Sequence, residues 1–565
     1  MALTNSCRHR QIACALCAIL LALFRPASAA DPVDTASAAA PRFVDGLKEQ
    51  TARVAKLRDG TLIAIFVQAG QAGPELVARN SRDNGDRWGE IQILTPLPND
   101  ERGWGSPEPL VDQDGELHVF FLKGRKKMPA GLDIDIWHAK SSERRTRWPP
   151  PRRIWEGYTG SLNGVLQMKS GRIVLPFSYM TKRTWADRGQ GFDAFTYMGT
   201  FDCTVLFSDD HGATWQESPT PLKTTAPDLG TYGAIEPVVV ELSDGRVWML
   251  LRTQHGRFYE SFSSDGGSWS KPQPSRILSS DSPAGLCRLD DGRIVLFWNN
   301  CLRFPYAYGG RHVLHGAISA DDGKTWRGFR EVARNPKRHE PPPPSGDHGA
   351  TYPIPCAINK GKITTTTGLP SPHFNLFVDP EWFYATSQSD DFRNGLEQWS
   401  AFGVKGVELA LHPDHADRRV LALRKTDADW PAGAVWNFPG GLEGRLRLRM
   451  MLNRGFAGAR IGITDHFSVP FDELDEFHNL FNLPIADDGS IDSHTALPTG
   501  KWFDLEFHWN NRDRQCTLSF DGRRALVLPQ NRTTLGACYL RLISTAATVD
   551  AAGLLVESVH VEIVP

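Results

Sequence analysis

The octapeptide Ser319-Ala-Asp-Asp-Gly-Lys-Thr-Trp326 follows a pattern, Ser-x-Asp-x-Gly-x-x-Trp, that is complete again at residues 81–88 and 208–215. A copy one residue shorter spans residues 263–269, and residues 141–148 keep the spacing with Glu and Arg in place of Asp and Gly. Glycine permits a positive φ, and an Asp carboxylate accepts backbone N–H bonds within a turn. Each copy therefore predicts a strand–turn–strand unit, with its Trp packed between neighbouring sheets.

A second repeated unit is a short turn that contains Gly and is followed by an apolar strand, as in Gly292-Arg-Ile-Val-Leu296. Six such units, roughly 57 residues apart and each with about four short strands, predict blades around an axis. Radial repetition leaves only short, protected edges, so we expect an all-β, six-bladed β-propeller over residues 30–388. The six glycines are Gly60, Gly115, Gly171, Gly245, Gly292 and Gly361.

Composition excludes several classes of protein. Of 565 residues, 63 are Lys or Arg and 65 are Asp or Glu, a net charge of −2 with no long like-charge block, which argues against a nucleic-acid partner.

Residues 1–29 combine basic Arg8 and Arg10, an apolar core and an Ala27-Ser-Ala29 cleavage site, typical of a secretory signal peptide. The mature chain is expected to be secreted or periplasmic, with no membrane span. It has no C-x-x-C spacing, so a zinc site is not expected, and it has no phosphate-cradling Gly-rich loop. We therefore expect neither a metal nor a cofactor.

The repeat stops after Tyr384, and residues 389–565 have a different pattern. Alternating strands at 505–509 and 516–520 meet an Asp521-Gly522 turn, which indicates a hairpin. This region resembles the jelly-roll β-sandwiches of the concanavalin/laminin-G type that are appended to secreted glycosidases. The resemblance implies a lectin-like domain that either binds sugar or braces the propeller.

The Ser-x-Asp-x-Gly-x-x-Trp pattern is the Asp box, or bacterial neuraminidase repeat. With Glu236-Pro237 and the later Arg252, it makes residues 45–385 resemble the sialidase (neuraminidase) superfamily. The resemblance implies a propeller whose axial pocket removes a terminal sialic acid from glycans. The Asp boxes themselves are interpreted as structural.

Counting back nine residues from each blade's glycine aligns the starts of the innermost strands. The aligned positions include Glu236 and Tyr352, on two different blades. We therefore expect these two side chains to face the same axis and to meet. The other aligned residues are Thr51, Ser106, Leu162 and Pro283.

The resemblance gives this pair a role, since sialidases use a Tyr nucleophile whose proton is taken by a Glu. The substrate's anomeric carbon carries a carboxylate, which repels an anionic nucleophile but not a neutral phenol. By this resemblance Tyr352 attacks, Glu236 is its base, and the reaction retains configuration.

The family also holds the substrate carboxylate with three arginines, whose planar guanidinium groups match it. Arg252, 16 residues after Glu236, matches the second, and Arg311, eight residues before an Asp-box serine, matches the third. Gln50 occupies the position of the first. Arg53 fits only with a three-residue shift, which reverses the face of the strand. Arg102, beside Trp104, is another candidate.

The general acid of the family, an Asp on the loop before the first Asp box, has no counterpart here. Residues 68–74 contain no Asp, and Glu75 is the nearest carboxylate. Asp347 and His348, in the Pro-rich loop before Tyr352, are alternatives. A carboxylic acid in this role needs a raised pKa to protonate the leaving oxygen.

The sequence thus indicates an exported, sialidase-like exo-glycoside hydrolase acting on a sialoglycoconjugate or a related acidic glycan. Two alternatives stay open. Gln50 in place of an arginine favours a hydrolase of the same scaffold with a different terminal sugar. The missing acid favours a non-catalytic, glycan-binding propeller.

Overall fold

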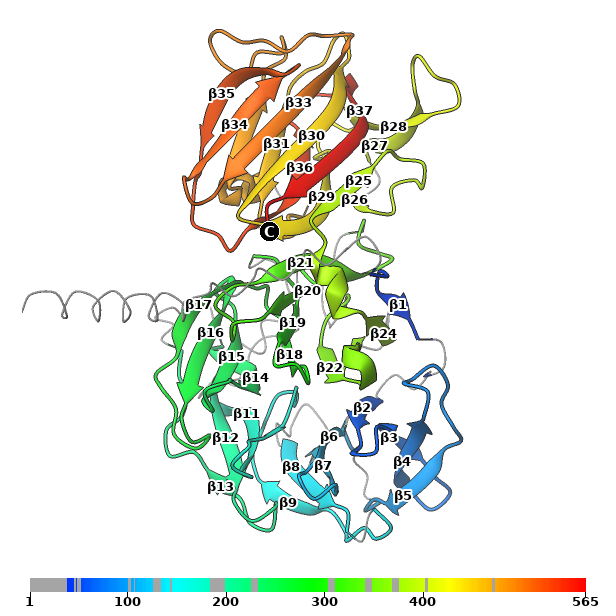
Figure 1. The fold of residues 1–565 in the computed structure, drawn as a ribbon, viewed down its shortest axis with the longest axis vertical. Helices are drawn as coiled ribbons and strands as arrows, with labels where there is room; N and C mark the ends of the chain where they lie inside the picture. The colour runs from blue at the N-terminus through cyan, green and yellow to red at the C-terminus, as the bar shows by residue number, and fades with distance from the viewer. Residues whose placement is uncertain are drawn as a thin grey trace, which may run out of the picture. The chain divides into compact units, whose positions relative to one another are not determined.

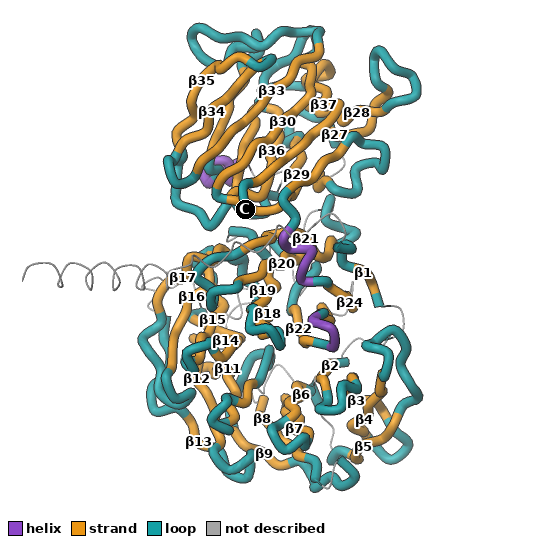
Figure 2. The backbone as a smooth tube through the Cα atoms, viewed as in Figure 1, coloured by secondary structure: helices purple, strands orange, loops and turns teal. Residues whose placement is uncertain are grey.

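The structure is a computed structural model, and its elements are almost entirely strands (Figure 2). The expected leader, residues 1–29, lies outside the residues that it describes. Among the described residues, no helix is both long and apolar enough to cross a bilayer. Short 3-10 helices occur at Asn359–Gly361, Pro380–Tyr384 and Glu473–His478. The described residues are 38–44, 47, 52–99, 103–105, 107–124, 134–142, 145–182, 199–224, 232–302, 310–340, 348–367, 375–401, 405–469 and 473–565.

The first four sheets are each four-stranded, antiparallel and in sequence order, and they lie around a common axis in a β-propeller (Figure 1). Their innermost strands β2, β6, β10 and β14 are the first strands of each sheet. The first two sheets are β2 (Arg53–Lys56), β3 (Leu62–Ala69), β4 (Pro74–Ser81) and β5 (Gln92–Pro96), then β6 (Glu108–Val111), β7 (Leu117–Gly124), β8 (Ile134–Lys140) and β9 (Arg152–Trp155). The next two are β10 (Leu166–Gln167), β11 (Ile173–Lys182), β12 (Gly199–Ser208) and β13 (Gln216–Glu217), then β14 (Ala234–Glu241), β15 (Val247–Thr253), β16 (Arg257–Ser263) and β17 (Gln273–Leu278).

The last of the four-stranded sheets joins the two ends of the repeat region. Strand β1 (Arg42–Phe43) pairs with β24 (Asn375–Val378), followed in the sheet by β23 (Ile363–Thr367) and β22 (Pro353–Ala357). A strand from before the first sheet therefore completes this one. Between the fourth sheet and this one, the strands β18 (Gly285–Arg288), β19 (Ile294–Trp298), β20 (Val313–Ser319) and β21 (Arg327–Arg334) also pair in order, as part of a nine-stranded sheet.

All six turn glycines used for counting have a positive φ, between 65° and 96°. Each lies between the first and second strands of its four-strand unit, from Gly60 between β2 and β3 to Gly361 between β22 and β23. A side chain is strained in this backbone region, so the turns require glycine. The alignment of innermost strands by counting from these glycines is confirmed.

The Asp boxes close the turns between the third and fourth strands. In the copy that begins at Ser208, the serine Oγ donates to Asp210 Oδ1 (2.8 Å) and accepts from the Gly212 N–H (2.8 Å). Trp215 packs edge-on against Phe120 of the preceding sheet, with ring centroids 5.5 Å apart. The copies at Ser81 and Ser319 make the same serine bonds. The boxes thus stabilise turns, and Trp215 packs between sheets as predicted.

The strands from Ser387 to Ile563 form one separate sheet and the remainder of the nine-stranded sheet. Both pack on one hydrophobic core, which includes the buried Trp399, Trp436 and Trp509. Strands β29, β36, β31 and β32 continue the nine-stranded sheet, with β26 beside β29. The other sheet has the order β27-β28-β37-β30-β33-β34-β35, with β25 beside β37. The Asp521-Gly522 turn joins β34 to β35 as predicted. The strands are β25 (Ser387–Asp390), β26 (Trp399–Ala401), β27 (Val407–Leu411), β28 (Arg419–Lys425), β29 (Gly433–Gly441), β30 (Glu443–Leu452), β31 (Ala459–Thr464), β32 (Phe481–Ile485), β33 (Trp502–Asn510), β34 (Gln515–Phe520), β35 (Arg523–Pro529), β36 (Ala537–Ser544) and β37 (Asp550–Ile563).

Candidate active site

Glu236 and Tyr352 occupy matching places in two sheets and share an unusual backbone conformation. Glu236 lies near the start of β14, and Tyr352 directly precedes β22. Their φ angles are 53° and 55°, in the left-handed region that non-glycine residues rarely adopt. Around Glu236 the pairing of β14 with β15 shifts register between Ile235 and Val238. Such an irregularity re-aims a side chain, and the positive φ recurs at the equivalent position, Tyr352.

The two side chains meet, although 116 residues separate them in the chain. The Tyr352 hydroxyl donates to Glu236 Oε1 at 3.1 Å. Arg252, on β15, donates from Nη1 to the Tyr352 hydroxyl oxygen (3.1 Å) and to Glu236 Oε2 (2.5 Å). All three side chains are at least nine-tenths buried. The phenol, the carboxylate and the guanidinium therefore form one closed cluster.

Asp281, which the sequence reasoning missed, is the second carboxylate of this cluster. It accepts from Arg252 Nε (2.8 Å) and from Gln254 Nε2 (3.1 Å), and the Tyr232 hydroxyl donates to it. Burial raises the pKa of Asp281, but the charges of Arg252 and Arg311, together with the hydrogen bonds from Tyr232 and Arg252, lower the pKa overall. A sequence signal was present, since Asp281 lies two residues before Pro283, the counterpart of Glu236 on its blade.

Arg311 is fully buried beside the cluster. Its Nη2 donates to the backbone oxygen of Asp281 (2.7 Å), and its guanidinium carbon lies 5.5 Å from the centre of the Tyr352 ring. The Arg311 carbonyl accepts from the Ala350 N–H at 2.9 Å. The two predicted arginines, Arg252 and Arg311, thus lie on either side of Asp281 and both reach Tyr352.

Arg53 lies elsewhere on the inner strands, in a pair with Glu108. Arg53 Nε and Glu108 Oε2 are 3.8 Å apart, and both side chains are more than nine-tenths buried. Both residues precede their blade's glycine by seven positions, so they are equivalents on β2 and β6. Burial raises the pKa of Glu108 to about 7, against the opposing charge of Arg53. Glu108 is a second residue that sequence reasoning missed.

The remaining predicted site residues are distributed as follows. Glu75, at the start of β4, is half-buried and accepts from Gln68 Nε2 at 3.1 Å, and no contact among the described residues joins it to Tyr352. His348 packs edge-on against His312, with ring centroids 6.2 Å apart. Gln50, Arg102 and Asp347 lie outside the described residues.

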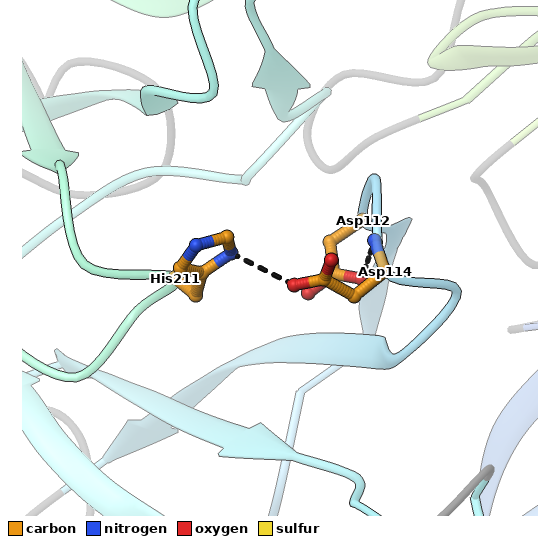
Figure 3. Close-up of side chains that lie close together, drawn as sticks. All are labelled: Asp112, Asp114 and His211. Carbon is orange, nitrogen blue, oxygen red and sulfur yellow. Dashed lines mark hydrogen bonds and ion pairs between the residues drawn. The ribbon is translucent and has the colours of Figure 1, made fainter.

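One group of side chains has the spacing of metal ligands: Asp112, Asp114 and His211, whose ligand atoms lie within 4.8 Å of one another (Figure 3). Asp112 is already surrounded by donors, since His118 Nε2 lies at 3.1 Å and Lys140 Nζ at 3.3 Å. A metal ion here would have to displace the lysine charge. The group therefore fits a turn-stabilising network better than a metal centre.

The four-stranded sheets around one axis and the Asp boxes between their third and fourth strands together define a class, the Asp-box β-propellers. The family model of the BNR repeat-like domain matches residues 60–364, which is more than half of the chain. The chain belongs to this family, and with it to the sialidase superfamily.

The chain is similar, at low identity, to one curated protein and to several solved structures. A sialidase from Micromonospora viridifaciens is 25% identical over 315 residues, which is 47% of this chain and 43% of the relative, so the match spans less than half of that protein. A solved protein of unknown function from Dyadobacter fermentans is 17% identical, with a TM-score of 0.43 over 60% of this chain and 97% of its own. The Trypanosoma rangeli sialidase is 13% identical, with a TM-score of 0.38 over 93% of this chain and 92% of its own.

Proposed function

We propose that the protein is an exo-glycoside hydrolase that releases a terminal acidic sugar, of the sialic acid type, with retention of configuration. The observation that carries this proposal is the hydrogen bond from the Tyr352 hydroxyl to Glu236 Oε1. A nucleophile within hydrogen-bond reach of a base is what covalent catalysis requires. The strained backbone at both residues supports a functional role, since such conformations cluster at functional sites.

The reaction has two steps. Tyr352 Oη forms a bond to the anomeric carbon while the bond to the leaving oxygen breaks, Glu236 takes the phenol proton, and an acid protonates the leaving group. Water then attacks the anomeric carbon and gives a proton to the deprotonated acid, while the bond to Tyr352 Oη breaks and Glu236 returns its proton to the phenolate. Arg252 and Arg311 hold the sugar carboxylate, for which paired guanidinium groups are suited.

The proposed site also needs a general acid and a third contact to the substrate carboxylate. Glu75 follows the turn between β3 and β4, and the Arg53–Ile65 pairing places this turn at the end of the sheet where β2 begins. Glu75 or Asp347 is proposed to protonate the leaving group. Arg53, Gln50 or Arg102 is proposed to complete the carboxylate site.

The pairing of Arg53 with Glu108 favours a second candidate. An arginine that faces a buried carboxylate is less available to a substrate carboxylate. A hydrolase of the same scaffold with a different terminal sugar would need only the remaining arginines.

We also propose the domain organisation: a leader at residues 1–29 that directs export, a six-bladed propeller at 30–388 and a jelly-roll β-sandwich at 389–565. The antiparallel order of β18–β21 and the β1–β24 pairing support six blades in a closed ring. The single core shared by the two C-terminal sheets supports the sandwich.

The test is hydrolysis of a fluorogenic α-ketoside of N-acetylneuraminic acid by the mature protein. We expect turnover that Tyr352→Phe abolishes, that Glu236→Gln lowers about 10²- to 10⁴-fold and that Arg311→Ala strongly weakens. Tyr259→Phe, at a half-buried tyrosine on β16, is the matched control and should keep full activity.

Full activity of Tyr352→Phe would exclude the covalent mechanism. Turnover of other terminal sugars, without release of sialic acid, would establish the second candidate. Glycan binding without turnover in every case would indicate a binding protein.

A further inference from the structure

A short segment of the C-terminal region, residues 464–469, packs against the end of strand β19. The Phe467 N–H donates to the Asn300 carbonyl at 2.7 Å, and Asn300 Nδ2 donates to the Asp465 carbonyl at 2.9 Å. Phe467 also forms an isolated parallel β-bridge with Cys301. The segment is therefore fixed to the residues that follow β19 by one backbone hydrogen bond and one bond from a side-chain amide.

Charged side chains of the C-terminal region also hold this segment in place. The buried His466 ring lies 3.0 Å from Asp465 Oδ1 through Nδ1 and 3.2 Å from Asp475 Oδ1 through Nε2. Arg532 Nη1 donates to Asp465 Oδ2 at 3.0 Å. Burial raises the pKa of Asp465, but its hydrogen bond with His466 and the charge of Arg532 lower it to about 2. This ion cluster keeps the backbone on both sides of Phe467 in place.

The Phe467 side chain lies between two aromatic rings. It is fully buried and stacks on His312, with ring centroids 5.7 Å apart and planes 27° apart, and it packs edge-on against Tyr539 at 6.0 Å. Burial lowers the pKa of His312 to about 3, so its ring is uncharged at neutral pH. Stacking of neutral rings adds to the apolar area that Phe467 buries.

His312 connects this contact to the candidate active site. It directly follows Arg311, and its ring packs edge-on against His348. The Arg311 carbonyl accepts from Ala350, which lies two residues before Tyr352. A shift of His312 would therefore move Arg311 and the residue 348–352 segment together.

We infer that Phe467 is a positioning residue for the candidate active site. By packing against His312, its ring fixes the position of His312 and thereby the positions of Arg311 and of the backbone before Tyr352. The catalytic consequence rests on the proposed function, whereas the structural consequence does not. This assigns the C-terminal region a bracing role at the site, which the sequence left open against sugar binding.

The experiment compares the full-length mature protein with Phe467→Ala, Phe467→Leu and Phe503→Ala. Phe503 is an equally buried phenylalanine on β33, packed edge-on against Phe520 within the C-terminal core. Hydrogen exchange of the peptide that contains Ala350 is measured by mass spectrometry, together with kcat and KM on the fluorogenic ketoside.

In Phe467→Ala we expect exchange at Ala350 to be at least about 10-fold faster and kcat/KM to fall about 10- to 100-fold, because small displacements of reacting groups cost this much. Phe467→Leu keeps most of the side-chain volume, so its exchange rate at Ala350 and its kcat/KM should lie between those of the wild type and Phe467→Ala. If the alanine variant does not fold, the leucine variant supplies the test. Phe503→Ala should leave both quantities at wild-type values.

Unchanged exchange at Ala350 in both Phe467 variants, or equal acceleration in Phe503→Ala, would overturn the inference. An absence of turnover in the wild-type protein would overturn the proposed function instead, and the exchange measurement would still decide the positioning role.

Discussion

At the scale of single residues, the site depends on side chains held in conformations that are costly in isolation. A left-handed backbone at a non-glycine residue costs roughly 1–2 kcal/mol, and both Glu236 and Tyr352 adopt it. The hydrogen bonds among Tyr352, Glu236 and Arg252, with Asp281 behind the arginine, offset this cost. The Tyr352 phenol and the Glu236 carboxylate are consequently held in contact by the fold itself.

Glu108 provides a prediction at this scale. Its pKa is raised from 4.5 to about 7 by burial, so the stability that this group contributes is present below pH 4.5 and is lost as the pH rises through 7. We expect Glu108→Gln, neutral at every pH, to gain up to about 3 kcal/mol over the wild type between pH 5 and pH 8, since one pKa unit corresponds to about 1.4 kcal/mol. Urea unfolding at the two pH values measures this difference.

The control for this measurement is Glu75→Gln, at a half-buried glutamate on β4. It measures the effect of replacing a carboxyl group by an amide outside the Arg53–Glu108 pair. Identical pH dependence in Glu108→Gln and the wild type would show that Glu108 does not titrate in this range.

At the scale of elements, the segment before β22 lies so close to the segment before β20 that only glycine fits at residue 349. A Cβ on Gly349, whose φ is 87°, would lie 2.1 Å from the Arg311 carbonyl oxygen. Gly245, in the turn between β14 and β15, has a φ of 84° but no atom within 4 Å of such a Cβ. A side chain added at either position would have the same unfavourable positive φ, but only at Gly349 would its Cβ also clash with another atom.

This difference makes a matched pair of variants. We expect Gly245→Ala to lower the free energy of unfolding by only about 1 kcal/mol, the cost of the positive φ alone. Gly349→Ala should cost several kcal/mol more or displace the segment before Tyr352, with loss of activity. Thermal unfolding and ketoside hydrolysis of the two variants test this, and equal effects would show that the Arg311 contact imposes no constraint.

At the scale of the whole molecule, a buried pair of histidines takes part in the packing between two neighbouring sheets of the propeller. His118 Nδ1 and His138 Nε2, on β7 and β8, lie 3.0 Å apart. The His138 ring packs edge-on against Trp215, from the Asp box of the next sheet, at 5.4 Å. Burial lowers the pKa of His138 well below 6.5, and the charges of His118, Arg152 and Lys140 lower it further. The joint between the two sheets therefore requires neutral imidazoles.

The joint gives a prediction about acid stability. Because the folded-state pKa of His138 is depressed, its neutral form stabilises the fold above pH 6.5, and this contribution is lost as the pH falls below that value. We expect His138→Gln to be less stable than the wild type at pH 8 but to lose less stability between pH 7 and pH 5. Melting temperatures across this range measure the slope, with the exposed His560→Gln as control. Equal slopes in all three proteins would contradict the prediction.

Much of the architecture could be predicted because it is encoded locally. An Asp box is closed by bonds within four residues, such as Gly212 N–H to Ser208 Oγ, so its residues alone define the turn. The six turn glycines are defined by their own φ angles in the same way. Since the repeat is regular, equal offsets from these glycines correspond to equal positions on the blades. That is why Glu236 and Tyr352 could be paired across 116 residues.

The sequence by itself therefore determined the repeat, the all-β fold, the family and the central pair of the site. Tertiary structure alone decided the partners of that pair: Asp281 between the two arginines, Glu108 opposite Arg53, and Phe467 behind His312. Arg53 and Glu108 share one offset from their blade glycines, and Asp281 lies close to an aligned position, but these offsets do not specify which side chains meet. The contacts depend on how whole sheets pack, which residue spacing by itself does not determine.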